Sequence, residues 1–371
     1  MLTRLMKYRI RNIEPYQYKE ALEEMYAEWK EFDAICNAEF LPAFEDTSDN
    51  SNNNDNNNNS GANDLTSKNN SSNNDSKPSN GLNNAKANKS FQERLKAMGE
   101  AIANLVSKVV GWFGEMFGKL NVKDDEFLKR LDRAKANNSN IQDVTVTTYM
   151  YQASTINASV TKIDQQFQQV SNAMDAMFDA YDDAAGMEKA SDDEIVGKMN
   201  FSSTALGKVL DNEKCDIRAD YYKELFKACN ISKFEETTEA EGFVKQWEAN
   251  ARGTKRDKDK DNGLQLTSAE GKSWVESCEN YLRGGIANTV GILKNGITHI
   301  QNAQKSTGAK ISAAIRGEVR TQKANERMQN ILNGYNKYLA FVAMFYKTAY
   351  KLAVEARDNY KLVLQAAYKF S

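Results

Sequence analysis

The chain contains almost no proline and almost no histidine. Its three prolines, Pro15, Pro42 and Pro78, all lie near the beginning, and the rest of the 371-residue chain has none. Proline disrupts helix interiors, so this absence favours long helices over a turn-rich β fold. The single histidine, His299, excludes a zinc site built from several histidines.

Cysteine pairs and long apolar runs are also missing. Cys36, Cys215, Cys229 and Cys278 are far apart, without a Cys-x-x-Cys pair. We interpret them as reduced, small apolar residues in a cytosol-like setting. The basic first eleven residues are not followed by an apolar segment, so we expect no signal peptide. No run of about 18 uncharged apolar residues exists, which predicts no ordinary membrane span.

The first 90 residues divide into two segments of different composition. Residues 1–45 contain a predicted amphipathic helix over 16–40. The segment from Ile13 to Asp46 contains ten acidic residues and only two lysines. This acidic segment is a candidate pro-segment. In residues 46–90, seventeen of 45 positions are Asn, and Leu65 and Leu82 are the only large apolar side chains. Such a stretch predicts a disordered linker.

An amphipathic helix is predicted over 91–120, with apolar residues at spacings of three and four. Glycines at 111, 114 and 118 lie beside bulky apolar side chains, although each interior glycine costs about 1 kcal/mol relative to alanine. We therefore expect close helix packing or bending at an interface. Core packing, a partner helix and a membrane surface remain open. The candidate partner interface consists of Trp112, Phe113, Met116 and Phe117.

The remainder predicts an elongated, mainly all-α bundle with a minor β element near 141–151. Residues 144–151 are rich in β-branched and aromatic residues, so they read as a strand that requires a partner. We divide this part into a helical body over 91–279 and a basic long-helix region over 280–371. A polar loop is expected over 253–263, and the last segment, about 310–369, is predicted as one helix or two helices broken near Asn333-Gly334.

Charge is unevenly distributed along the chain. Residues 280–371 carry a net charge of +10 and the remainder −12, although the total is −2. A basic helical surface attracts nucleic acid, anionic lipid or an acidic protein face, and here the acidic face could be the protein's own front half. The candidate basic surface consists of Lys294, Lys305, Lys310, Arg316, Arg320, Lys323 and Arg327. Nonspecific DNA contact is the expected nucleic-acid mode, because no base-reading motif is present.

Motifs for catalysis or metal binding are incomplete. The segment Asp257 to Gly263 resembles the start of a calcium loop, but Asn262 and Ser268 occupy the positions that require Gly and Glu. Gly271-Lys272-Ser273 ends like a phosphate-binding loop but lacks the earlier glycine. We interpret His299 as structural, because no Cys or acid lies at a triad-like spacing. We expect no enzymatic activity, no cofactor and no metal.

The order of segments carries a resemblance to a family. An amphipathic helix from Ile102 to Leu120 precedes the charged segment Asp124 to Arg130, the Ile141 to Tyr151 strand and long helices. This order resembles uncharacterised virion structural and internal head proteins of large tailed bacteriophages. The resemblance implies a non-enzymatic virion protein made in the bacterial cytoplasm, with copies of itself or other virion proteins as partners. It also implies proteolytic trimming after Glu, which Leu22-Glu23-Glu24 and Met98-Gly99-Glu100 fit loosely.

Two main function classes follow. The first is an internal head or portal-associated virion protein that assembles through amphipathic helices, with a basic C-terminal surface near DNA or acidic partners. The second is a membrane-active helical protein for genome ejection or pore formation that uses the 91–120 helix. A non-phage scaffold or adaptor is a third class. In the first class, we expect the acidic N-terminal segment to act as a detachable counter-charge on its linker.

Overall fold

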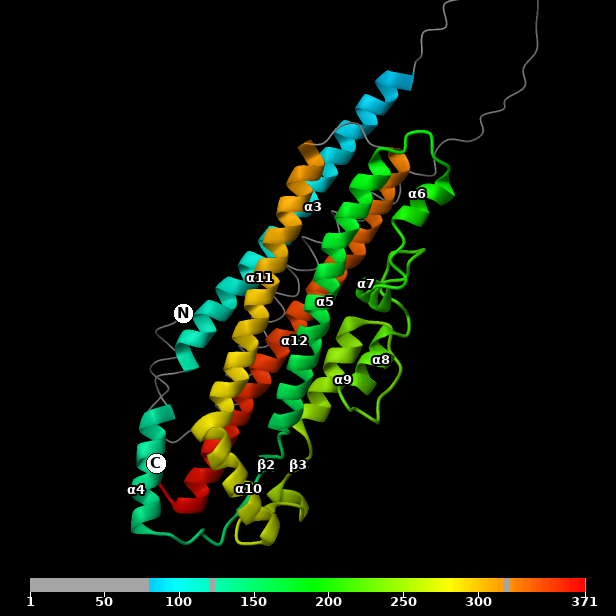
Figure 1. Cartoon of the computed structure of the whole chain (residues 1–371). Coiled ribbons are helices and arrows are strands. Elements are labelled where there is room, and N and C mark those ends of the chain that lie inside the picture. Colours follow the sequence, from blue (N-terminus) through cyan, green and yellow to red (C-terminus); the bar gives the residue numbers. More distant parts are fainter. Residues whose placement is uncertain (1–79, 121–123, 317–320, 371) are drawn as a thin grey trace, which may run out of the picture. The chain divides into compact units, whose positions relative to one another are not determined.

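The computed structural model describes residues 80–120, 124–316 and 321–370 (Figure 1). By its internal contacts the chain divides into two units, Met1–Lys77 and Pro78–Ser371. All described residues belong to the second unit. The predicted acidic helix over 16–40 and most of the predicted linker therefore lie outside the described residues.

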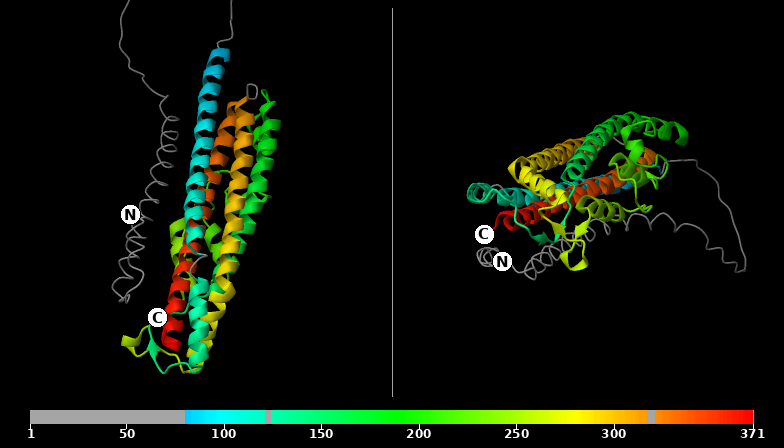
Figure 2. Two further views of the ribbon diagram at one scale, coloured as in Figure 1. Left: turned by 90° about the vertical axis from the view of Figure 1, so that its left-hand side faces the viewer. Right: turned by 90° about the horizontal axis from the view of Figure 1, so that it is seen from below.

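Four long helices form the body of this unit: α3 (Asn80–Leu120), α5 (Ala153–Ala185), α11 (Ile286–Arg316) and α12 (Gln322–Tyr368). Helix α11 contacts α3 and α5, and α12 contacts the same two helices from the other side. As Figures 1 and 2 show, α3 and α12 run in one direction, and α5 and α11 run in the other. The result is an elongated four-helix bundle.

The core forms where the apolar stripes of these helices meet. On α5, apolar residues at spacings of three and four are buried along the helix, from Val160 and Ile163 to Met177 and Tyr181. Helix α12 is buried over much more of its circumference, because α3, α5, α11 and several shorter helices all contact it. It is the central helix of the unit. The spacing-based prediction of a helical bundle is confirmed.

Helix α3 begins earlier and is packed differently from the sequence-based expectation. It starts at Asn80, inside the segment predicted as linker, so a helix replaces the last part of that linker. Its apolar stripe from Phe91 to Phe113 is buried against the bundle. Close packing, one of the two roles expected for the glycines, is wrong at two positions, because a Cβ atom on Gly111 or Gly114 would meet nothing within 4 Å. Bending at an interface stays a prediction. These glycines face open space and do not serve close packing.

The C-terminal helices are divided differently from the prediction. Helix α10 (Ala269–Asn280), the π-helical turn η3 (Tyr281–Gly285) and α11 follow one another without a break, so residue 280 lies within a continuous helical run. Helix α12 continues through Asn333-Gly334, where a break was one alternative. Gly334 has a packing role instead: an added Cβ would collide with the carbonyl oxygen of Cys215.

Shorter helices cover one side of the bundle: α6 (Asp192–Lys198), α7 (Ala205–Val209), α8 (Tyr221–Ala228) and α9 (Ala240–Arg252). Helix α6 begins with a capping box, in which the side chains of Ser191 and Glu194 bond each other's backbone N–H groups. Tyr222 of α8 and Phe243 of α9 pack against Phe341 of α12, and Phe226 of α8 packs against Phe243.

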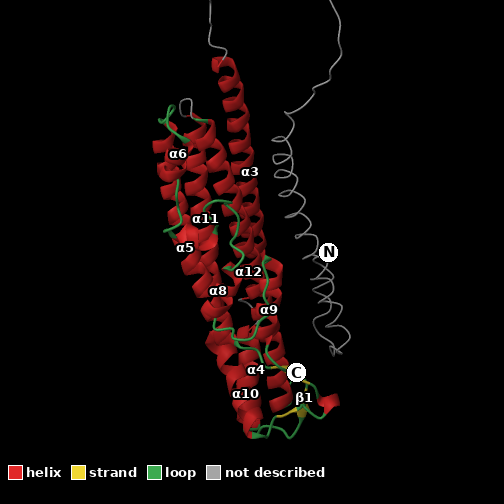
Figure 3. Cartoon of the chain, turned by 90° about the vertical axis from the view of Figure 1, so that its right-hand side faces the viewer, coloured by secondary structure: helices red, strands yellow, loops and turns green. Residues whose placement is uncertain are grey.

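Helix α4 (Asp124–Asn137) and four very short strands lie at one end of the bundle (Figure 3). Strand β1 (Thr145–Val146) pairs antiparallel with β4 (Leu264–Gln265), and β2 (Thr148–Tyr149) pairs with β3 (Lys255–Arg256). The 3₁₀ turn η2 (Lys258–Lys260) lies between β3 and β4. The second part of the predicted strand thus pairs with residues of the predicted polar loop, and its first part pairs with the two residues that directly follow this loop. The mainly α fold with a minor β element near 141–151 is confirmed within the described residues.

Candidate functional site

The seven residues of the predicted basic surface lie in different environments. Lys294, Lys305 and Arg316 are exposed on α11. Lys310 bonds Asp179 of α5 at 2.6 Å, which raises the pKa of the lysine, and Lys323 pairs with Asp192 of α6. Arg327 is buried, and Arg320 lies outside the described residues. Only part of the predicted set therefore forms an exposed basic surface.

Arg327 corrects the surface prediction, because its side chain is only 8% exposed. One terminal nitrogen, Nη1, lies 2.9 Å from Sγ of Cys215, and the other, Nη2, donates to Oδ1 of Asn212 at 3.0 Å. The guanidinium also lies over the ring of Phe201. These contacts attach α12 to the segments around α7. Burial raises the pKa of the Cys215 thiol despite the nearby guanidinium, which disfavours a reactive thiolate.

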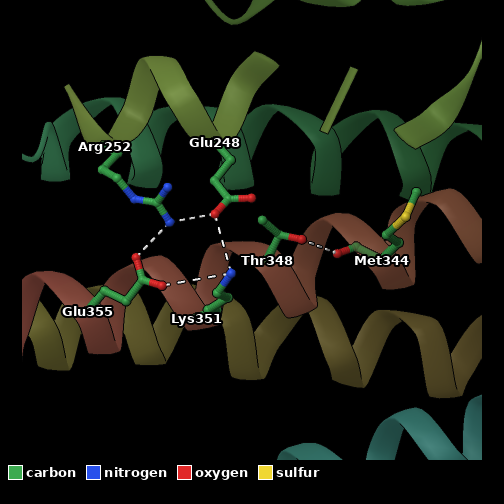
Figure 4. Close-up of polar contacts among 6 residues, drawn as sticks. All are labelled: Glu248, Arg252, Met344, Thr348, Lys351 and Glu355. Atoms are coloured by element: carbon green, nitrogen blue, oxygen red, sulfur yellow. Dashed lines mark hydrogen bonds and ion pairs between the residues drawn. The ribbon is translucent and has the colours of Figure 1, made fainter. Parts of the chain in front are cut away.

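A second set of charges links α9 to α12 (Figure 4). Nη2 of Arg252 lies 2.6 Å from Glu248 and 2.9 Å from Glu355, and Nζ of Lys351 lies 3.4 Å from Glu248. Burial alone would lower the pKa of Arg252, but the two carboxylates outweigh it and the pKa is raised. Glu355 is 5% exposed, so this is a desolvated network that requires all of its partners.

Further ion pairs join the basic C-terminal region to acids elsewhere in the same unit. They are Arg283 with Asp132, Lys337 with Asp216, and Lys361 with Asp124. The alternative that the basic region matches the protein's own acidic residues therefore accounts for much of the charge within the described residues.

His299 takes part in a buried polar cluster between three helices. Its Nδ1 lies 2.9 Å from Oδ1 of Asp164 on α5, and the hydroxyl of Tyr346 on α12 donates to the same oxygen at 2.9 Å. Gln168 donates to the other carboxylate oxygen at 3.0 Å. Burial, reinforced by the Asp164 charge, raises the pKa of Tyr346 well above its ordinary value. The phenol therefore stays protonated and serves as a donor.

Sequence spacing missed this cluster because Asp164 lies 135 residues before His299. One signal was present. Asp164 lies four residues after Val160 and three before Phe167, so it interrupts the apolar stripe of α5. An acid on such a stripe requires a buried partner.

Trp112 and Phe113, the two residues of the predicted aromatic interface whose side chains are described, pack against helix α12 of the same chain. Phe113 is 1% exposed, and its ring lies 5.9 Å from that of Tyr350 on α12. Half-buried Trp112 packs edge-on against Tyr350 at 5.5 Å, with Nζ of Lys347 5.2 Å from its ring centre. Nothing is described for the side chains of Met116 and Phe117. The partner of this face is an intramolecular helix.

Other motifs resolve into local structure. Asp257 accepts a hydrogen bond from the backbone of Asp259 and pairs with Lys255. The described residues contain no group of three or more His, Cys, Asp or Glu placed to hold a metal ion. Met98-Gly99-Glu100 matches the expected cleavage motif loosely. Met98 is buried in α3, and the peptide bond after Glu100 lies inside this helix.

The described unit is, in class, a four-helix bundle whose polar groups link its own helices. None of the helices within the described residues is both long enough and apolar enough to cross a bilayer. Comparison of the chain with protein-family models, with curated proteins and with solved structures found no match.

Proposed function

We propose that this chain is a non-enzymatic structural protein of a phage virion, internal to the head or associated with the portal. In this role the bundle of residues 80–370 is a rigid body that assembles with copies of itself or with other virion proteins. The sequence resemblance supplies the setting, and the structure supports the mechanical part of the proposal. The protein is made in the bacterial cytoplasm and resides in the particle.

The observation that carries the proposal is that polar side chains connect the helices. Asp164 joins α5 to α11 and α12, the Arg252 network joins α9 to α12, and Arg327 joins α12 to the segments around α7. Buried polar contacts of this kind hold neighbouring helices together and favour one packing arrangement. A structural component of an assembly requires such rigidity.

The membrane-active alternative is less well supported. It requires the apolar stripe of α3 to face lipid, but Leu95, Ile102 and Leu105 are at most 3% exposed in the bundle. Lipid insertion would require α3 to leave α11 and α12 and to expose their core. The structure offers no separate apolar face on α3 for this purpose within the described residues.

The experiment is quantitative mass spectrometry of purified particles and of the soluble and membrane fractions of infected cells. We expect peptides from residues 80–371 in the particles, at many copies per particle. Coverage of residues 1–77 tests the predicted removal of the N-terminal segment. Recovery of the chain only in the soluble or membrane fraction would contradict the proposal.

A further inference from the structure

Asp164 is a buried carboxylate that joins three of the four long helices. Its side chain is 12% exposed, and its two oxygens contact Gln168 of α5, His299 of α11 and Tyr346 of α12. None of these partners within the described residues is a lysine or an arginine. The amide and the phenol are neutral donors, so only the imidazole can supply a positive charge. The buried negative charge is therefore compensated only when His299 is protonated.

One ring nitrogen of His299 faces the carboxylate, and the other is open to proton exchange. Nδ1 lies 2.9 Å from Oδ1 and 3.0 Å from Oδ2 of Asp164. An ionised carboxylate only accepts hydrogen bonds, so Nδ1 carries the donated proton. The His299 side chain is 32% exposed, and in the described part of the chain Nε2 is not among the enclosed side-chain atoms that lack a hydrogen-bond partner. A proton can therefore bind or leave at Nε2 while the Nδ1 hydrogen bond stays in place.

We propose that His299 is a pH-sensitive lock on the joint between α5, α11 and α12, tight in mild acid and loosened above neutral pH. With Nε2 protonated, Asp164 and His299 form an ion pair whose net charge is zero. With Nε2 unprotonated, the hydrogen bond remains, but the joint holds one uncompensated carboxylate. Opposite charges in contact attract strongly where water is partly excluded. The protonated joint therefore holds α11 more firmly against α5 and α12.

The stability that this pair contributes decreases as the pH rises. Histidine ordinarily changes its charge between about pH 5 and 8. When a histidine gains an anionic partner on folding, the folded chain binds the proton more tightly than the unfolded chain does. The resulting stability is fully present at the acidic end of this range and is lost as the pH rises and the folded form releases the proton. The bundle should therefore be more stable at about pH 6 than at about pH 8.

The groups around the pair keep a constant charge in this range. On α12, burial raises the pKa of Tyr346 and of Tyr338 above the ordinary value, and the Asp164 charge adds to both shifts. On α5 and α11, the residues one turn from Asp164 and from His299 carry no charge. Helix α3 and the turn η3 also contact α11, but no hydrogen bond or ion pair within the described residues links either of them to the pair. The imidazole is therefore the group of this joint that titrates near neutral pH.

His299 is the only histidine of the chain, so the proposed response can be measured in the whole protein. Burial raises the pKa of the thiols of Cys215, Cys229 and Cys278, which keeps these thiols protonated in the same range. Groups farther away, such as the terminal amine, contribute equally to the wild type and to its variants. The difference between the wild type and a His299 variant therefore isolates the lock.

The test is urea denaturation of the full-length protein at about pH 6 and about pH 8, followed by circular dichroism. His299→Gln keeps an amide donor on the same helix but cannot become charged. From the lower to the higher pH, the equilibrium constant for unfolding should increase at least about threefold more in the wild type than in this variant. Asp164→Asn removes the charge from the other side of the pair and should reduce the increase in the same way. It also decides the test if His299→Gln does not fold.

Tyr346→Phe is the matched control, because it removes a neutral donor from the same carboxylate and keeps the pair. This variant should be less stable at both pH values and should retain the pH dependence of the wild type. A difference below about threefold between the wild type and His299→Gln, an unchanged pH dependence in Asp164→Asn, or an equal loss of it in Tyr346→Phe would overturn the inference. The lock does not rest on the proposed virion role, because it is measured with isolated protein, whereas that role is tested by the composition of particles.

Discussion

Helices α11 and α12 both belong to the basic C-terminal region, yet they use their cations in opposite ways. On α12, Lys347 lies over the ring of Trp112, Lys351 joins the Glu248 network and Arg327 is buried against Cys215. On α11, Lys294 and Lys305 are exposed on a face without acids. Two adjacent helices of similar charge thus serve cohesion in one case and an outward surface in the other.

The difference follows from how much of each helix is covered. Helix α12 is contacted by α3, α5, α11 and the shorter helices α6, α9 and α10, so its cations must find acids or aromatic rings as they lose water. Helix α11 is contacted chiefly by α3, α5 and α12, which leaves one side in solvent. Cations there stay in contact with water, so they lose less hydration than the cations of α12. Coverage by neighbouring helices, more than the number of charges, decides what each cation does.

The strongest way to break the comparison is to remove a half-buried cation that serves cohesion. Arg252→Met should leave Glu355 and Glu248 with only Lys351 and should lower the free energy of unfolding by about 3 kcal/mol. Urea denaturation measures this change. The double variant with Glu355→Gln should recover part of the loss, since the unpaired buried charge is gone. A loss below about 0.5 kcal/mol in the single variant would mean that the network does not hold α9 to α12.

Two glycines on α11 compare its covered and open sides directly. An added Cβ at Gly296 would lie 2.6 Å from the Tyr346 ring, so Gly296→Ala should displace the phenol from Asp164 and cost about 1–3 kcal/mol. At Gly291 nothing lies within 4 Å, so Gly291→Ala should stabilise the helix by up to about 1 kcal/mol. Thermal unfolding of both variants provides the measurement. The same sign of change in both would refute the assignment of the two faces.

Acid should weaken the cohesive ion pairs selectively. Burial would raise the pKa of Glu279, but hydrogen bonds from Lys135 and Arg283 outweigh it and the pKa is lowered from 4.5. A lowered pKa in the folded state gives stability above the unfolded value, and this stability is lost as the pH falls through the folded value. Glu279→Gln should therefore show a shallower loss of stability than wild type between about pH 5 and 3. Parallel pH profiles would contradict this role.

The smallest effect on stability is expected at the three exposed cations of α11, Lys294, Lys305 and Arg316. The triple variant Lys294→Gln, Lys305→Gln and Arg316→Gln changes exposed side chains, so its free energy of unfolding should stay within about 0.5 kcal/mol of the wild type. Urea denaturation of the variant sharpens the comparison with Arg252→Met. A loss of several kcal/mol would place these cations among the cohesive charges of the bundle.

Much of the fold could be predicted because apolar spacing reports directly on helices. Apolar spacing predicted an amphipathic helix over 91–120, and the apolar residues of α3 from Phe91 to Val109 are buried. The strand near 145–149 was also identified, but its partners at 255–256 and 264–265 were not, because two-residue strands carry almost no pattern. Asn333-Gly334 was one predicted place for a helix break, because glycine often marks the end of a helix. In the structure, Gly334 lies within α12, and its missing side chain leaves room for the backbone of Cys215.

The sequence by itself determined that long amphipathic helices form, which of their faces turn inward, and that the C-terminal region carries the positive charge. Only the tertiary structure decided which cations remain in solvent and which are neutralised inside. Arg252 and Glu355 are 103 residues apart, and Asp164 and His299 are 135 apart. Local patterns describe neighbours within a few turns, whereas the environment of a charge depends on every helix that packs around it.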